Sequence, residues 1–220
     1  MEIQRTSSLP RLTACSRMPE WMRHFGRPAG FLGSLAGHLM AVKNRKRSLS
    51  VLALVAPRPG ERILEVGFGP GVDIHRVSRI AAFVAGVDSS PVMVRQALRR
   101  NTQAIRAGKV ELQLGAAHSL DFPDDAFDKV FSINSAQFWP EPFAVIRELQ
   151  RVLKVHGRIV LAVQPRSHGA NAQTSQETAS ELVALLSESG FQNITAELRP
   201  AEPVPIACVI ASKSAPPVSA

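Results

Sequence analysis

A chain of 220 residues, with 45% apolar and 20% charged residues, suits one soluble α/β domain with a modest appendage and is too short for two large domains. The net charge of +8 lies wholly in the first 60 residues, which hold ten of the 26 Lys and Arg but only two of the 18 Asp and Glu. A basic segment beside a neutral domain can steer an anionic substrate, a membrane surface or RNA, or it can be a solvated helix face and no more.

The cysteines and the apolar runs exclude two further classes of protein. Cys15 and Cys208 lie far apart and in no metal-binding spacing, which argues against a disulfide framework or a structural metal site and fits a cytoplasmic location. No apolar run reaches the roughly 18–20 residues that a membrane span needs. We therefore expect a cytoplasmic chain without a transmembrane segment.

The N-terminal quarter divides into two expected parts. Residues 1–20 lack a strong pattern and are expected to be a flexible terminus. Residues 21–56 carry apolar side chains at roughly helical spacing, which predicts one or two amphipathic helices that form an extension or lid. These side chains are Leu35, Leu39, Val42, Leu49 and Leu52. A Pro/Gly-rich stretch at 57–60 ends the extension, so the main domain is expected over 57–220.

From Glu61 onward, short apolar runs alternate with helical segments. We predict strands at 63–66, 83–87, 110–114, 129–133, 158–163, 192–198 and 206–212. We predict helices near 72–79, 91–106, 142–153 and 176–188. The alternation indicates a parallel sheet covered on both faces, whereas the short turn between the last two strands predicts an antiparallel pair.

A glycine-rich turn follows the first predicted strand. Residues 65–71 read EVGFGPG and lie between a strand and a helix, where glycines let a ligand approach the backbone. The spacing is G-x-G-x-G, and the position where a nicotinamide fingerprint wants a further glycine is Val72. Glu65 also argues against a dinucleotide, because a carboxylate can hold a ligand's ammonium group but would repel a pyrophosphate. The turn therefore argues against an oxidoreductase that uses a nicotinamide dinucleotide.

An acidic residue ends the second predicted strand. Asp88 follows the first glycine, Gly67, by 21 residues and lies at the strand edge where open α/β sheets bind their ligands. Its carboxylate can accept both hydroxyls of a ribose, or it can simply cap the next helix. Ser89 and Ser90 lie nearer to that helix and could cap it equally well, so we assign Asp88 to the ligand.

Several ordered motifs between residues 61 and 163 together resemble the class I S-adenosylmethionine-dependent methyltransferases, in the type 11, ubiquinone-biosynthesis-like branch of small-molecule enzymes. Residues 64–71 resemble the first motif of that family, and residues 86–90 with Met93 resemble the second. Residues 120–130 resemble its L-P-F-x-D-x-x-F-D-x-V run, and 148–158 its E-x-x-R-V-L-K-P-G-G-R run. The resemblance implies a Rossmann-like seven-stranded, mostly parallel sheet of order 3-2-1-4-5-7-6 with the seventh strand antiparallel.

The resemblance also implies S-adenosylmethionine as cofactor and S-adenosylhomocysteine as product. Glu65 and the turn with Gly67, Phe68, Gly69 and Gly71 would face the methionine part of the cofactor. Asp88 and Ser89 would face the ribose, with Met93 near the adenine. The loop after the third strand, Ala116, Ala117 and His118, would also border the adenine, although the family usually has Gly-Asp-Ala there. The missing carboxylate at Ala116 removes one expected contact, and His118 either replaces part of it or faces solvent.

The acceptor side is less defined by sequence. After the fourth strand, Asn134 can offer an amide to the cofactor, and Phe138 and Trp139 offer apolar faces that either border the acceptor or belong to the core. In the extension, Trp21 and Phe25 could close over an apolar acceptor. Methyl transfer from a sulfonium mainly needs alignment and exclusion of water, so no catalytic residue is assigned.

Three other functions are weighed. A nucleic-acid methyltransferase would suit the basic N-terminus, but the chain has no N/D-P-P-Y/F motif after the fourth strand and no Tyr for base stacking. A non-catalytic S-adenosyl-binding protein would be consistent with Ala116, where the usual carboxylate is missing. A nicotinamide oxidoreductase is disfavoured by Val72. The main expectation is methyl transfer to a small, unidentified acceptor, with an anionic one left open and the oligomeric state undetermined.

Overall fold

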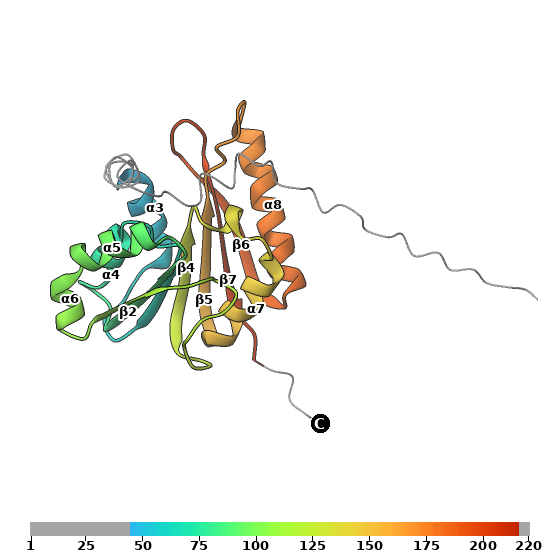
Figure 1. The fold of residues 1–220 in the computed structure, drawn as a ribbon. Coiled ribbons are helices and arrows are strands. Elements are labelled where there is room, and N and C mark those ends of the chain that lie inside the picture. Colours follow the sequence, from blue (N-terminus) through green and yellow to red (C-terminus); the bar gives the residue numbers. More distant parts are fainter. Residues whose placement is uncertain (1–44, 216–220) are drawn as a thin grey trace, which may run out of the picture.

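The computed structural model describes residues 45–215, except for the side chains of residues 45 and 46. Within this range seven strands form one sheet with the order β3-β2-β1-β4-β5-β7-β6 (Figure 1). The strands are β1 (Arg62–Val66), β2 (Phe83–Asp88), β3 (Val110–Leu114), β4 (Phe127–Ile133), β5 (Leu153–Val163), β6 (Phe191–Arg199) and β7 (Ile206–Lys213). Strands β1 to β5 pair in parallel, whereas β7 pairs antiparallel with both β5 and β6. The predicted order and the antiparallel seventh strand are confirmed.

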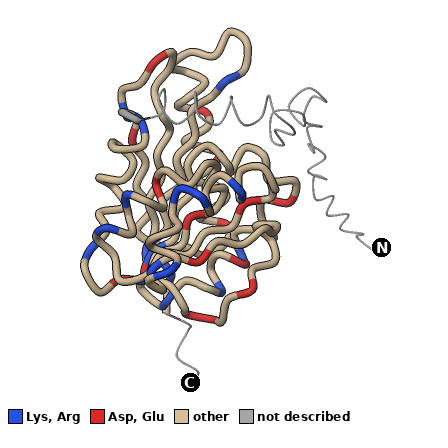
Figure 2. The backbone as a smooth tube through the Cα atoms, turned by 60° about the vertical axis from the view of Figure 1, so that its left-hand side comes forward, with Lys and Arg blue, Asp and Glu red and all other residues tan. Residues whose placement is uncertain are grey.

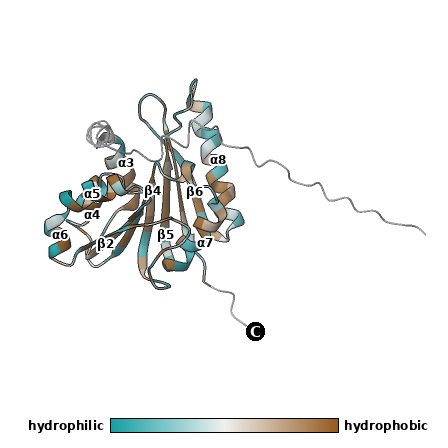
Figure 3. Cartoon of the chain, in the orientation of Figure 1, coloured by the Kyte–Doolittle hydropathy of each residue, from teal (hydrophilic) through white to brown (hydrophobic). Residues whose placement is uncertain are grey.

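Helices cover both faces of the sheet. They are α3 (Arg45–Val55), α4 (Val72–Val77), α5 (Pro91–Arg100), α6 (Thr102–Arg106), α7 (Pro142–Val152) and α8 (Ala172–Glu188), with a 3-10 turn at Ala136–Phe138. Helices α3, α4 and α5 pack with one set of strand side chains, and α7 and α8 pack with the other (Figure 1). The central strands are therefore apolar on both faces, as the brown strands of Figure 3 show.

Side-chain alternation explains how one strand serves two cores. Ile63 faces α3 and α4, whereas its neighbour Leu64 faces α7. In β4, Phe131 and Val130 divide in the same way. Since successive side chains of a strand point to opposite faces, a short apolar run supplies both layers at once.

The structure corrects two details of the predicted helices. The helix expected over 91–106 is two helices, because Asn101 interrupts it and turns its buried Nδ2 to the Gly71 and Ala97 carbonyl oxygens, at 3.1 and 2.9 Å. Helix α8 begins at Ala172, four residues earlier than expected, because Asn171 and Thr174 form a capping box. Both corrections come from polar side chains that apolar periodicity does not register.

The described part of the predicted extension belongs to the sheet's covering layer. Helix α3 buries Val51 and Val55 completely against the sheet, whereas Leu49, expected on the apolar face, is 49% exposed. Residues 1–44, including the rest of the proposed lid, lie outside the described residues. No helix of the described part is long and apolar enough to cross a membrane.

Candidate functional site

The glycine turn after β1 holds three glycines in the left-handed region, with φ of 75° at Gly67, 53° at Gly69 and 71° at Gly71. A Cβ on Gly67 would overlap the Ser135 side chain, and one on Gly71 would lie 2.6 Å from the Ala97 Cβ. A Cβ on Gly69 would meet no atom within 4 Å. Gly67 and Gly71 therefore serve close packing, whereas Gly69 leaves open space where a ligand can approach the backbone.

Glu65 is a buried carboxyl group at the end of β1. It lies in register between Gly86 of β2 and Phe131 of β4, and only 2% of its surface is exposed. Burial, followed by the nearby Asp73 and Asp88 carboxyls, raises the pKa of Glu65 well above its usual value. Its Oε2 atom has no hydrogen-bond partner among the described residues. An unpartnered buried carboxylate oxygen is costly alone and suits a cationic ligand group.

Asp88 ties the glycine turn to the end of β2. Its Oδ2 accepts the Gly69 backbone N–H and its Oδ1 accepts the Ser90 N–H, both at 2.8 Å. Burial raises the pKa of Asp88, and these two backbone donors partly oppose the rise. The cap of α5 is Ser90, whose Oγ accepts the Met93 N–H at 3.4 Å. Because a carboxylate offers about four acceptor positions, Asp88 retains capacity for ligand hydroxyls.

The structure brings the other residues expected to bind the cofactor to the same edge of the sheet. The loop after β3 begins at Gly115, whose N–H donates to the Asp88 carbonyl oxygen at 3.1 Å, so residues 116–118 follow directly beside Asp88. Met93 is buried at the start of α5, and His118 is exposed. Phe68 is buried, with its ring against Gly86, so it supports the turn from below.

Side chains of the loop after β4 make hydrogen bonds and core contacts within the protein. Asn134 has φ of 54°, and its Oδ1 accepts the Gln164 N–H at 2.8 Å, which leaves the amide NH₂ as the part available to a ligand. Trp139 is 8% exposed, packs in the core with α7, and its indole Nε1 donates to the Ser135 Oγ at 3.3 Å. Phe138 is partly buried. Trp21 and Phe25 lie outside the described residues.

Sequence reasoning missed several residues that shape this edge. Ser135 packs against Gly67, and Asn101 bonds to the Gly71 carbonyl oxygen. Ser48 of α3 donates to Asp73 Oδ2, and the Arg100 guanidinium donates to the Pro70 carbonyl oxygen. Each contact joins elements that are distant in sequence, so no local motif could predict it.

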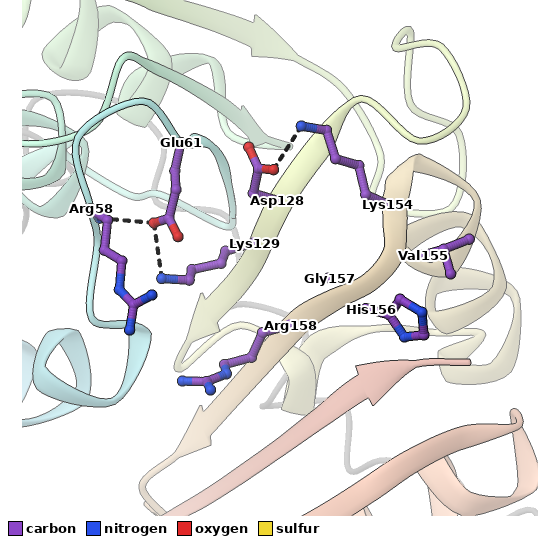
Figure 4. A pocket seen from close by; sticks show the side chains of 9 residues that line it. All are labelled: Arg58, Glu61, Asp128, Lys129, Lys154, Val155, His156, Gly157 and Arg158. Carbon is purple, nitrogen blue, oxygen red and sulfur yellow. Dashed lines mark hydrogen bonds and ion pairs between the residues drawn. The ribbon is translucent and has the colours of Figure 1, made fainter. Parts of the chain in front are cut away.

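A hollow of about 260 Å³ lies at the opposite, amino-terminal edge of β1, β4 and β5. Figure 4 shows Lys129 reaching Glu61 and Lys154 reaching Asp128, at 2.9 and 2.6 Å. These ion pairs consume both carboxylates of the hollow, and no cluster of metal-binding side chains occurs anywhere in residues 45–215. The hollow is remote from the glycine turn, so the candidate site is the carboxyl edge of the strands.

Comparison with known proteins shows what the chain is similar to. Residues 64–161 match the methyltransferase domain family. The chain is 28% identical over 183 residues to the uncharacterized methyltransferase YdaC of Bacillus subtilis, and the alignment covers 82% of this chain and 99% of YdaC. It is 30% identical over 141 residues to the 27-O-demethylrifamycin SV methyltransferase of Amycolatopsis mediterranei, covering 61% of this chain but 52% of that protein.

A solved structure agrees in fold. The S-adenosylmethionine-dependent methyltransferase from Aquifex aeolicus superimposes with a TM-score of 0.63 at 20% identity, covering 76% of this chain and 89% of that chain. Residues 64–161 therefore resemble a methyltransferase domain, and the fold of the described residues is the Rossmann-like fold of this solved methyltransferase. The resemblance drawn from the motifs and the predicted fold class are both confirmed.

Proposed function

We propose that this protein transfers a methyl group from S-adenosylmethionine to a small-molecule acceptor. The observation that carries the proposal is the buried, unpartnered Glu65 oxygen beside the open backbone at Gly69 and the carboxylate of Asp88. A zwitterionic amino-acid end and a ribose are the two groups that such a site complements.

Each residue of the site fits one part of the cofactor. Glu65 would bind the ammonium group, Gly69 would let the cofactor lie against the turn, and Asp88 would accept ribose hydroxyls while it holds the Gly69 N–H. Met93 and residues 116–118 would border the adenine. S-adenosylmethionine supplies an activated methyl group on a sulfonium, so the protein's share is to orient the two molecules and exclude water.

The same residues argue against a nicotinamide dinucleotide. Burial and the nearby Asp73 and Asp88 carboxyls, which disfavour the charged form of Glu65, equally disfavour a further negative charge such as a pyrophosphate. Val72 opens α4, so the turn offers no further glycine for a dinucleotide to lie against.

A small acceptor is favoured over nucleic acid by the distribution of charge. Figure 2 shows Lys and Arg interspersed with Asp and Glu around the described fold, and residues 61–220 balance to zero. The A. mediterranei relative bears the name of an enzyme for a small molecule. RNA binding that weakens steeply with salt would support the nucleic-acid alternative instead.

Two measurements test the proposal. Calorimetry with S-adenosylhomocysteine and NAD should detect only the first ligand, and tight NAD binding alone would overturn it. Labelled S-adenosylmethionine incubated with metabolite extracts should then give a methylated product that mass spectrometry identifies. Binding without transfer to any metabolite would point to the non-catalytic S-adenosyl-binding alternative.

A further inference from the structure

Two arginines near the carboxyl edge of the sheet lie close enough for their charges to interact, and neither forms an ion pair among the described residues. Arg47 lies in the first turn of α3, and Arg166 follows the end of β5. The Nε and Nη1 atoms of Arg47 are buried and have no hydrogen-bond partner within the described part of the chain. Desolvation by burial, and then the positive charge of Arg166, lower the pKa of Arg47 to about 10.

The direction of α3 brings Arg47 to the site. The carbonyl oxygen of Ala56, just beyond the end of α3, accepts from the Lys129 ammonium, beside the hollow of the opposite edge. Ser48, near its beginning, donates to Asp73 beside the buried Glu65 carboxyl. The helix therefore runs from the carboxyl edge of the strands to the amino edge, and Arg47, the residue before Ser48, lies near the carboxyl edge.

Within residues 45–215, no carboxylate forms an ion pair with Arg47 or Arg166. Asp73 already accepts from Ser48 and pairs with Arg76 at 2.7 Å. Arg166 remains accessible to solvent, yet the surrounding protein lowers its pKa by desolvation. Two neighbouring guanidinium groups, one with buried unpaired nitrogens, repel each other unless an anion lies between them.

We propose that Arg47 and Arg166 bind an anionic group of the acceptor, a carboxylate or a phosphate. Guanidinium groups present forked donors that match both oxyanions, often in bidentate pairs. The inference rests on the proposed methyl transfer and specifies the class of acceptor for the same site.

The placement of Arg166 assigns the anion to the acceptor and not to the cofactor. Glu65 and Asp88 end β1 and β2, whereas Arg166 follows β5, which is separated from β1 by β4. Two strand spacings amount to roughly 10 Å. The basic N-terminal quarter would add a favourable field for an anionic acceptor that approaches this side.

The test uses the full chain, inorganic phosphate as probe, and the variants Arg47→Gln, Arg166→Gln and Arg166→Lys. Phosphate titrated into protein saturated with S-adenosylhomocysteine should bind to the wild type and bind at least tenfold more weakly to both Gln variants. Arg166→Lys should recover part of the loss. Arg158→Gln, which removes an arginine from the opposite edge (Figure 4), should leave phosphate binding unchanged.

The following results would overturn the proposal or separate it from the proposed function. Equal phosphate binding by wild type and both Gln variants would overturn the proposal, as would a methylated product from the extract that carries no negative charge. A tenfold loss of S-adenosylhomocysteine affinity in Arg47→Gln would also overturn it, because the pair would then hold the cofactor's carboxylate. If the wild type binds no S-adenosylhomocysteine, the proposed function fails, and phosphate titration of the ligand-free protein still decides whether the anion site exists. Melting temperatures of the ligand-free Gln variants should equal or exceed that of the wild type, since one of two repelling charges is gone.

Discussion

Replacing Glu65 by Gln removes one ionisable group from a buried position and changes almost no volume. In the ligand-free protein the raised pKa means that folding favours the protonated carboxyl. Its contribution to stability is therefore largest at low pH and is lost as pH rises from the unfolded pKa through the raised folded pKa. Each unit of that separation corresponds to about 1.4 kcal/mol. Glu65→Gln should therefore melt at a higher temperature than the wild type at the alkaline end of this window.

The same substitution should weaken cofactor binding. An ammonium group needs the ionised carboxylate, so wild-type affinity for S-adenosylhomocysteine should rise with pH through the raised pKa of Glu65 and then level off. A charge-assisted hydrogen bond contributes about 1.5–3 kcal/mol, which corresponds to a loss of roughly tenfold to a hundredfold in Glu65→Gln. The variant should also lose the pH dependence.

Calorimetry over a pH series, with thermal melting of the ligand-free protein, measures both effects. The matched control is Glu61→Gln at the opposite edge, where Glu61 pairs with Lys129 at 2.9 Å. It should leave the affinity for S-adenosylhomocysteine unchanged. If Glu65→Gln binds as tightly as the wild type with the same pH profile, Glu65 does not bind the ammonium group and the reasoning fails.

Three further predictions follow from the turn, the loop after β3 and the N-terminal quarter. Both Gly67→Ala and Gly69→Ala carry the cost of a left-handed backbone, about 1–2 kcal/mol. Gly67→Ala should lower the melting temperature more, because the new methyl group at residue 67 overlaps the loop after β4. Gly69→Ala should instead weaken S-adenosylhomocysteine binding at least tenfold in calorimetry, and wild-type affinity there would contradict the open approach. Ala116→Asp should strengthen that binding by at most about tenfold, the effect of one net hydrogen bond, and a weaker complex would place the adenine elsewhere. Deleting residues 1–44 should leave a folded protein that binds S-adenosylhomocysteine but does not transfer a methyl group, and normal transfer by this variant would refute the lid. Deletion through residue 56 also removes α3 and should unfold the chain, as measured by circular dichroism.

The sequence determined the fold and the cofactor side of the candidate site. Short apolar runs mark the strands because both faces of a parallel sheet are buried, and this signal is local. Glu65, the glycine turn and Asp88 each follow directly from a strand end, so the sheet order alone brings them to one edge. Their contacts with a cofactor stay predictions.

Only the tertiary structure decided which side chains and glycines pack within the protein and which leave atoms or space available to a ligand. The pattern could not tell that Gly67 packs against Ser135 while Gly69 faces open space, or that Trp139 belongs to the core. The interaction between the charges of Arg47 and Arg166 was equally hidden. It depends on the direction in which α3 crosses the sheet, and that direction is fixed by packing between elements far apart in the chain, which no local periodicity encodes.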